Sequence, residues 1–356
     1  MNIVNSEDSR YTSLYHYYYY KILRIFFQKV YMEKHFWFMR QAGRYLPEYR
    51  ATREQAGGFL KLCFNPELAC EVTLQPIRRF DFSHSIIFSD ILTIPYSLGY
   101  DVTIDENKGG PIVQTIGTIE EIEKLEKADL TKLSKVLTAI EKTREKLPQK
   151  THLIGFCGAP WTLAIYMIQG KSNSTNQETH LFAYKNKIHF EKLITILTNT
   201  IIEYAEQQIL AGCNTFQLFD SWASFLTDEE FENYVLKPHQ TIFKTLKTKY
   251  PQITFIGFPR GIGTNYTKYV QQSECDIVGC DVSLSYETME NLQKYCGVQG
   301  NLDPLLLIQG GDLLESTVKK LCHLYQSGKY IFNLGHGILP QTPIEHVEKV
   351  IQIIKN

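Results

Sequence analysis

The stretch His35-Phe-Trp-Phe-Met39 is followed directly by Arg40-Gln-Ala-Gly-Arg44, so a short apolar run ends in two cations. It is the first of eight such runs, and the others cover residues 85–89, 152–157, 215–219, 254–258, 276–280, 297–300 and 330–334. Each run is apolar almost throughout and does not alternate with polar residues, which is typical of parallel strands covered on both faces. The sequence therefore predicts eight buried parallel strands.

Segments with helical periodicity lie between these runs. They cover residues 66–80, 119–147, 187–210, 228–248, 313–324 and 344–354, with two shorter ones at 267–272 and 286–294. Eight strand-helix units in succession predict an α/β fold, a single-domain (β/α)8 barrel with its site at the carboxyl ends of the strands. The alternative is an open doubly wound sheet, but no Gly-x-Gly-x-x-Gly follows a strand, which disfavours its dinucleotide-binding form. The polar stretch 171–179 is expected to be a mobile loop over one end of the barrel.

Residues 1–31 differ from the rest of the chain. They contain the aromatic run 17–20 and a further apolar stretch interrupted by Lys21, Arg24 and Lys29. These charges argue against a transmembrane helix, which needs ~20 apolar residues, and against a secretory signal. We expect a poorly ordered extension, or sequence upstream of a true start at Met32, and a barrel spanning residues 32–356. A weak interfacial amphipathic helix is the alternative.

Composition narrows the class of protein. The 356 residues carry a formal net charge of -1, so the chain lacks the global basic field of a nucleic-acid binder. Its eight cysteines form no Cys-x-x-Cys pair and lie in apolar contexts, which indicates reduced core cysteines in a cytoplasmic protein. Any anion binding must therefore be local.

The two arginines at the end of the first run suggest such a local site. If the segment turns helically, the four-residue spacing puts Arg40 and Arg44 on one face, where each can take a carboxylate by two parallel hydrogen bonds. This predicts a substrate with several carboxylates. The alternative is a solvated helix face near Glu48, Arg50 and Glu54, with ordinary surface ion pairs.

Polar residues also follow other apolar runs. In a barrel these positions lie at the carboxyl ends of the strands, where the active site is found. They include Asp90, Tyr166 on the helix after the third strand, Ser221, Asp281, Asn301, Asp303 and His336. We expect these side chains to converge on one mouth, with Asp281 and Asp303 anchoring loops. From their positions alone, Tyr166 and Ser221 are favoured as an ordinary helix residue and an ordinary strand-end residue. His336 is as compatible with a turn histidine satisfied by backbone as with a ligand contact.

Five motifs carry a resemblance to one family. They are Trp37-x-Met-Arg-Gln-Ala-Gly-Arg-Tyr-Leu-Pro-Glu-Tyr49, Ile-Ile-Phe-Ser-Asp-Ile-Leu (86–92), Gly-Phe-Cys-Gly-Ala-Pro-Trp-Thr-Leu-Ala-Ile-Tyr (155–166), Phe-Asp-Ser-Trp-Ala (219–223) and Asn-Leu-Gly-His-Gly-Ile (333–338). In this order they resemble the motifs of the uroporphyrinogen decarboxylases, and the resemblance covers residues 35–350. Two departures are His35, where proline is expected before the tryptophan, and Gln169, where glutamate is expected.

The resemblance implies a set of substrate contacts. These are Arg40, Gln41, Ala42, Gly43, Arg44, Asp90, Tyr166, Ser221 and His336, of which Asp90, Arg40 and Arg44 are implied to be catalytic. Asp90 would hold the pyrrole N–H groups and favour developing positive charge. The arginines would pair with carboxylates, and one could help to deliver a proton, although arginine is a poor acid at pH 7.

The resemblance also implies an activity. The family removes the four acetate carboxyls of uroporphyrinogen III as CO2, giving coproporphyrinogen III in heme biosynthesis. A protonated pyrrole can accept the electrons left by CO2, so we expect no metal and no organic cofactor. A homodimer without a membrane span is implied as well.

Two rivals differ from this interpretation in class. A corrinoid methyltransferase barrel would bind zinc through a His-x-Cys pair, but none of the ten histidines is followed two positions on by cysteine. A tetrapyrrole-binding barrel without turnover stays open, because binding and catalysis would use the same residues.

Overall fold

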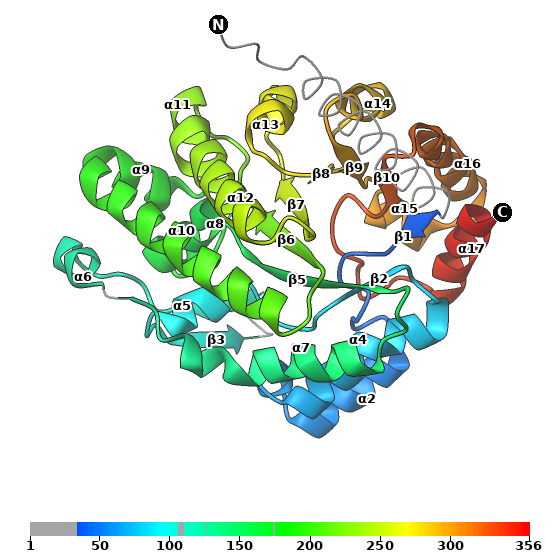
Figure 1. The fold of residues 1–356 in the computed structure, drawn as a ribbon, viewed down its shortest axis with the longest axis horizontal. Helices are drawn as coiled ribbons and strands as arrows, with labels where there is room; N and C mark the ends of the chain where they lie inside the picture. The colour runs from blue at the N-terminus through cyan, green and yellow to red at the C-terminus, as the bar shows by residue number, and fades with distance from the viewer. Residues whose placement is uncertain (1–33, 106–109, 126, 174) are drawn as a thin grey trace, which may run out of the picture.

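The computed structural model describes residues 34–105, 110–125, 127–173 and 175–356. Eight parallel strands form one sheet in the order β1-β10-β9-β8-β7-β6-β5-β2. They are β1 His35–Phe36, β2 His84–Ile86, β5 His152–Gly158, β6 Thr215–Asp220, β7 Thr254–Pro259, β8 Ile277–Gly279, β9 Gly297–Gln299 and β10 Tyr330–Phe332. Each predicted strand is present and the sheet curls into a nearly closed barrel ringed by helices (Figure 1), so the predicted (β/α)8 fold is confirmed.

The barrel closes between β1 and β2 through the residue that precedes β2. Ser83 Oγ accepts a hydrogen bond from Phe36 N at 2.7 Å and donates one to Phe36 O at 2.9 Å. Ser83 N also donates to Phe36 O, at 3.2 Å. A serine side chain therefore does at this seam what a regular strand ladder does elsewhere in the barrel.

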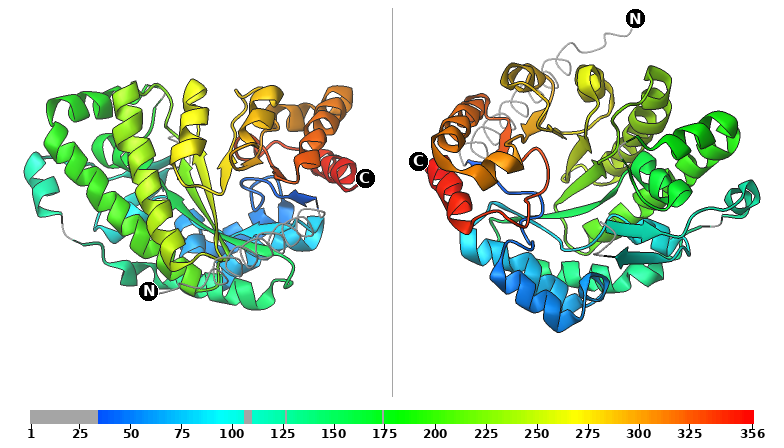
Figure 2. Two further views of the ribbon diagram at one scale, coloured as in Figure 1. Left: turned by 45° about the horizontal axis from the view of Figure 1, so that its top comes forward. Right: turned by 180° about the vertical axis from the view of Figure 1, so that it is seen from behind.

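The helices lie around the outside of the barrel, as two further views show (Figure 2). Those of the first half are α2 Pro47–Ala56, α3 Phe59–Cys63, α4 Pro66–Phe80, α5 Thr93–Ser97, α6 Ile119–Lys124, α7 Ser134–Lys146, α8 Pro160–Gln169 and α9 Gln177–Lys185. Those of the second half are α10 Lys187–Leu210, α11 Asp228–Glu230, α12 Lys237–Lys249, α13 Tyr266–Gln272, α14 Tyr286–Leu292, α15 Pro304–Gln309, α16 Gly311–Cys322 and α17 Ile344–Lys355. None of the helices in the described ranges is long and apolar enough to cross a membrane.

Local sequence explains the clearest helix boundaries. Helix α4 begins after Asn65, whose side chain accepts a hydrogen bond from Leu68 N at 3.1 Å, and its first residue is Pro66. Both residues are favoured at those positions, because the cap satisfies a free N–H and proline has no N–H to lose. The helix ends where Asp81 adopts a left-handed conformation.

Three predictions about local structure are corrected. The helix expected over 119–147 divides into α6, the 3-10 turn Leu130–Leu133 and α7, because Asp129 accepts from Thr131 N and starts a new turn. The chain between α5 and α6 holds an antiparallel hairpin, β3 Val102–Asp105 and β4 Gly110–Val113, which was not predicted. The loop expected over 171–179 ends at Asn176, since α9 begins at Gln177. All eight cysteines are free thiols and seven are buried, as predicted.

The proposed extension 1–31 lies outside the described residues.

Candidate active site

The Arg40–Arg44 segment is a turn at the end of β1. Arg40 has a φ of 60°, which a helix does not allow, so the expectation that this segment turns helically is wrong. The turn is held by backbone hydrogen bonds from Gln41 N to Phe38 O and from Leu46 N to Gly43 O, at 2.9 and 3.0 Å. Both arginines nevertheless line one cavity.

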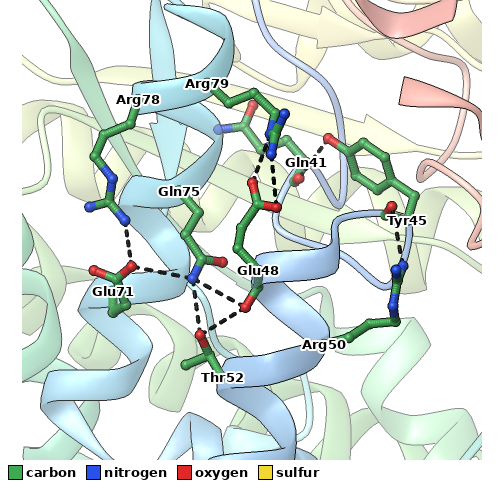
Figure 3. Close-up of polar contacts among 9 residues, drawn as sticks. All are labelled: Gln41, Tyr45, Glu48, Arg50, Thr52, Glu71, Gln75, Arg78 and Arg79. Atoms are coloured by element: carbon green, nitrogen blue, oxygen red, sulfur yellow. Dashed lines mark hydrogen bonds and ion pairs between the residues drawn. The ribbon is translucent and has the colours of Figure 1, made fainter. Parts of the chain in front are cut away.

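Polar contacts from Tyr45 and from the following helix α2 brace this turn (Figure 3). Tyr45 Oη donates to Gln41 O at 2.9 Å, and Arg50 Nη1 donates to Arg44 O at 2.7 Å. Glu48 is occupied by Arg79, whose Nε and Nη2 lie 2.7 and 3.1 Å from its two carboxylate oxygens. This carboxylate is therefore directed to α4 and not to the arginine pair, contrary to the surface ion-pair alternative.

A cavity of about 660 Å³ opens at the carboxyl ends of the strands. This size lies in the range of sites for small molecules and cofactors. Eight of the nine predicted contact residues line it: Arg40, Ala42, Gly43, Arg44, Asp90, Tyr166, Ser221 and His336. The side chain of Gln41 does not reach the cavity, because it accepts from Phe38 N and donates to His84 O. Its amide braces the turn from within.

The side chain of Arg40 packs against Gly337 where it enters the cavity. A Cβ at Gly337 would lie 2.8 Å from both Cγ and Nε of Arg40, so only a glycine leaves room for this side chain. The guanidinium is surrounded by protein but open to the cavity. Desolvation lowers the pKa of Arg40, while the nearby Asp90 and Tyr166 raise it and Arg44 and Arg260 lower it further. Arginine nevertheless remains charged at neutral pH.

Asp90 is a carboxyl group in a poorly solvated place. Its Oδ1 accepts a hydrogen bond from Leu92 N at 2.8 Å. Desolvation raises the pKa of Asp90, against the opposing effects of the Leu92 N–H and Arg40. A carboxylate in such a place gains more from a cation than one in water does. Asp90 is therefore suited to stabilise positive charge that develops in the cavity.

His336 is neutral in this setting. Burial, Arg40 and Arg260 lower the pKa of His336 to about 3, and Asp281 opposes them. Within the described ranges its Nδ1 is buried without a hydrogen-bond partner, which disagrees with a turn histidine satisfied by backbone. A neutral imidazole with an unused nitrogen can exchange a hydrogen bond with a bound ligand.

The other polar residues at strand ends divide into cavity residues and anchors. Tyr166 Oη shares a hydrogen bond with Ser172 Oγ at 3.1 Å, so the α8-α9 loop meets the cavity there. Asp281 accepts from Gly261 N, Tyr266 Oη and Ser283, and Asp303 accepts from Leu305 N at the start of α15. These two aspartates anchor loops, as predicted.

Sequence reasoning missed two cations of the cavity. Arg53 lies on α2, one helical turn after the cavity residue Tyr49, with its guanidinium 5.6 Å from the centre of the Phe59 ring. The four-residue spacing from Tyr49 could have revealed it. Lys171 lies in the segment predicted to be a loop, and nothing in the sequence marks it as a cavity residue. Phe59, Phe88, Phe156 and Phe219 supply apolar walls.

Comparisons with known proteins agree on one family. The model of the family described as uroporphyrinogen decarboxylase (URO-D) matches residues 20–356. The chain is 44% identical to the uroporphyrinogen decarboxylase of Brucella anthropi over 335 residues, which cover 94% of this chain and 98% of the relative. The enzyme of the same name from Brucella canis is also 44% identical, with the same coverage.

Solved structures support the fold. A methyltransferase from Methanosarcina mazei superimposes with a TM-score of 0.72 at 16% identity, covering 86% of this chain and 90% of that one. A B12-independent methionine synthase from Shewanella sp. gives a TM-score of 0.55 at 12% identity, covering 82% and 85%. At these identities the likeness concerns the barrel and not the reaction.

Proposed function

Since the chain belongs to the uroporphyrinogen decarboxylase family, we propose that it decarboxylates uroporphyrinogen III to coproporphyrinogen III in heme biosynthesis. The observation that carries this proposal is that Asp90, Arg40 and Arg44 line the same cavity. A polycarboxylate macrocycle needs cations for its side chains, an anion for its pyrrole N–H groups and apolar walls for its rings. The cavity offers all three.

The chemistry requires an electron sink but no added group. A proton on the pyrrole carbon next to an acetate makes the ring cationic. The pair of electrons from the bond to the carboxylate then moves into the ring as CO2 leaves. The resulting methylene takes a proton to become methyl, and the ring carbon returns its proton, so each CO2 released consumes one proton. No metal or organic cofactor is needed, because the substrate itself accepts the electrons.

Each cavity residue has a part in this scheme. Asp90 accepts hydrogen bonds from the pyrrole N–H groups and stabilises the cationic ring. Arg40 and Arg44 pair with acetate or propionate carboxylates, and the backbone of Gln41, Ala42 and Gly43 borders the ring system. Tyr166, Ser221 and neutral His336 exchange hydrogen bonds with the substrate's polar groups.

The test is turnover. Purified protein, incubated with uroporphyrinogen III under anaerobic conditions, should release four CO2 per substrate and yield coproporphyrinogen III by chromatography. Treatment with a chelator beforehand should leave turnover unchanged. Tight binding of uroporphyrinogen without CO2 release would instead make the protein a tetrapyrrole-binding barrel.

Three finer points are part of the proposal. The family suggests a homodimer, which light scattering on a sizing column would detect. The free cysteines support a cytoplasmic location. A chain starting at Met32 should keep the melting temperature and turnover of the full chain if residues 1–31 are an extension.

A further inference from the structure

Three histidines meet at the end of the barrel opposite the cavity. His35, His84 and His152 are the first residues of β1, β2 and β5. Because the strands are parallel, their amino ends lie on one side of the barrel and the cavity at their carboxyl ends on the other. This cluster has no part in the proposed reaction.

The strand register brings the rings together. His84 and His152 are direct partners across the β2–β5 pair, and their rings stack with centres 4.6 Å apart. The ring of His35 meets them at steep angles, with centres 5.4 and 5.7 Å away. One nitrogen from each ring lies within 4.8 Å of the other two.

A hydrogen bond orients the central ring. Ser83 Oγ lies 2.9 Å from both Phe36 O and His84 Nδ1. When the serine donates its only proton to Phe36 O, it accepts the Nδ1–H of His84. His84 then keeps a lone pair on Nε2. Such an outer partner, which orients a histidine and fixes its tautomer, is a regular feature of metal sites.

We propose that His35, His84 and His152 bind one divalent transition-metal ion of the zinc type, with a water as fourth ligand. Three imidazoles without a carboxylate suit zinc, cobalt or nickel, and not magnesium or calcium. Tetrahedral zinc with Zn–N bonds of about 2.0 Å needs nitrogens about 3.3 Å apart, so the rings must turn toward a common centre. His84 is buried, but His35 and His152 are partly exposed, which gives an ion a way in.

The position suggests what the ion does. His35 belongs to β1, and the other two to β2 and β5, so the ion would tie the strands together across the seam that Ser83 bridges. The nearby Arg144 opposes a cation, but its guanidinium is directed to the carbonyls of Leu147, Pro148 and Thr151.

The experiment measures metal binding and stability in the full chain. Protein stripped with a chelator and desalted is given one equivalent of ZnCl2 or CoCl2. We expect one zinc per chain by elemental analysis, a melting temperature raised by several degrees, and visible absorption from tetrahedral cobalt. His35→Ala and His152→Ala should each weaken zinc binding by at least ~100-fold, more than the 10–100-fold expected for loss of an outer partner. His323→Ala, at an exposed histidine outside the cluster, should behave like wild type.

Three outcomes would overturn the proposal. They are no zinc binding by wild type, zinc binding by His35→Ala and His152→Ala as tight as that of wild type, and loss of zinc binding in His323→Ala. The melting temperature of each metal-free variant is measured first. If His152→Ala does not fold, zinc binding by the His35→Ala variant decides the result, because His35 is partly exposed. These readouts do not depend on decarboxylation, so they stand apart from a failure of the proposed function.

Discussion

The two ends of this barrel hold polar clusters of opposite character. At the carboxyl ends, Arg40 and Asp90 line an open cavity. At the amino ends, His84 and His152 are packed against each other, and burial lowers the pKa of His152 to about 4, assisted by His35 and Arg144. The polar groups of the mouth face a cavity that a ligand can fill, while the imidazoles at the base already contact one another. Substitutions at the mouth should therefore change catalysis, and those at the base should change stability.

The largest effect is expected for Asp90→Asn. If the ionised carboxylate stabilises a cation formed mainly in the transition state, kcat should fall by at least about a thousandfold, roughly 4 kcal/mol, with substrate still bound. The folded-state pKa of Asp90 is raised, so ionisation of this group costs stability above its unfolded pKa near 3.8. The variant should therefore melt at the same temperature as wild type or higher at pH 7. Steady-state kinetics and thermal unfolding test both, and near-normal kcat would reduce Asp90 to a positioning residue.

Features that depend on local sequence could be predicted, and features that depend on distant residues could not. The strands were predicted because their apolar runs are local, and α4 and α10 because their helical periodicity is local. The motif residues Asp90 and His336 follow directly from where strands end. The turn of Gln41 away from the cavity was not predictable, because it depends on His84 O, 43 residues away.

The cluster of three histidines at the amino ends of the strands was not predicted, for the same reason. His35, His84 and His152 are far apart in the chain, and each looks like an isolated histidine at the start of an apolar run. Only the register between β2 and β5 and the closure at β1 bring their rings together. The hairpin β3–β4 was missed because its strands are short and lie outside the barrel repeat.

A second prediction concerns the space that Arg40 needs. In Gly337→Ala the new methyl would contact Cγ and Nε of Arg40 and push the guanidinium from its place. A displacement of about 1 Å near the chemistry can cost 100-fold, so kcat/KM should fall by about 10 to 100-fold. Gly117→Ala is the matched control, because its Cβ would meet only the flexible end of Glu121 at 3.2 Å. Equal kinetics for the two variants would mean that Arg40 has no fixed role.

A third prediction assigns Arg44 to substrate binding. Arg44→Ala should raise KM by about 10 to 150-fold, the 1.5 to 3 kcal/mol expected for a charged hydrogen bond, and leave kcat within a few-fold. Arg78→Ala serves as control, because Arg78 is an exposed arginine paired with Glu71 on α4. A fall in kcat at constant KM for Arg44→Ala would place this arginine in the transition state instead.

The smallest effect is expected for His336→Asn, which tests whether this histidine acts as a neutral group. Because its pKa is about 3 in the folded protein, His336 stays uncharged from pH 5 upward, and asparagine can replace its hydrogen bond. KM should rise by less than about tenfold, and the pH profile of kcat between 6 and 8 should keep its shape. A kinetic pKa near 6.5 in wild type that disappears in His336→Asn would mean that the imidazole transfers a proton.

Stability provides an independent check on the same residue. The folded pKa of His336 lies below the unfolded value of 6.5. The folding stability that depends on a neutral imidazole here is therefore fully present above pH 6.5, and it is lost as the pH falls toward 3. Within that window the unfolded state alone binds the proton, which costs wild type about 1.4 kcal/mol per pH unit. Urea unfolding at pH 7 and pH 5 should therefore show a smaller loss of stability for His336→Asn than for wild type. Equal losses would mean that His336 takes up its proton near its ordinary pKa, so that the arginines at the mouth do not hold it neutral.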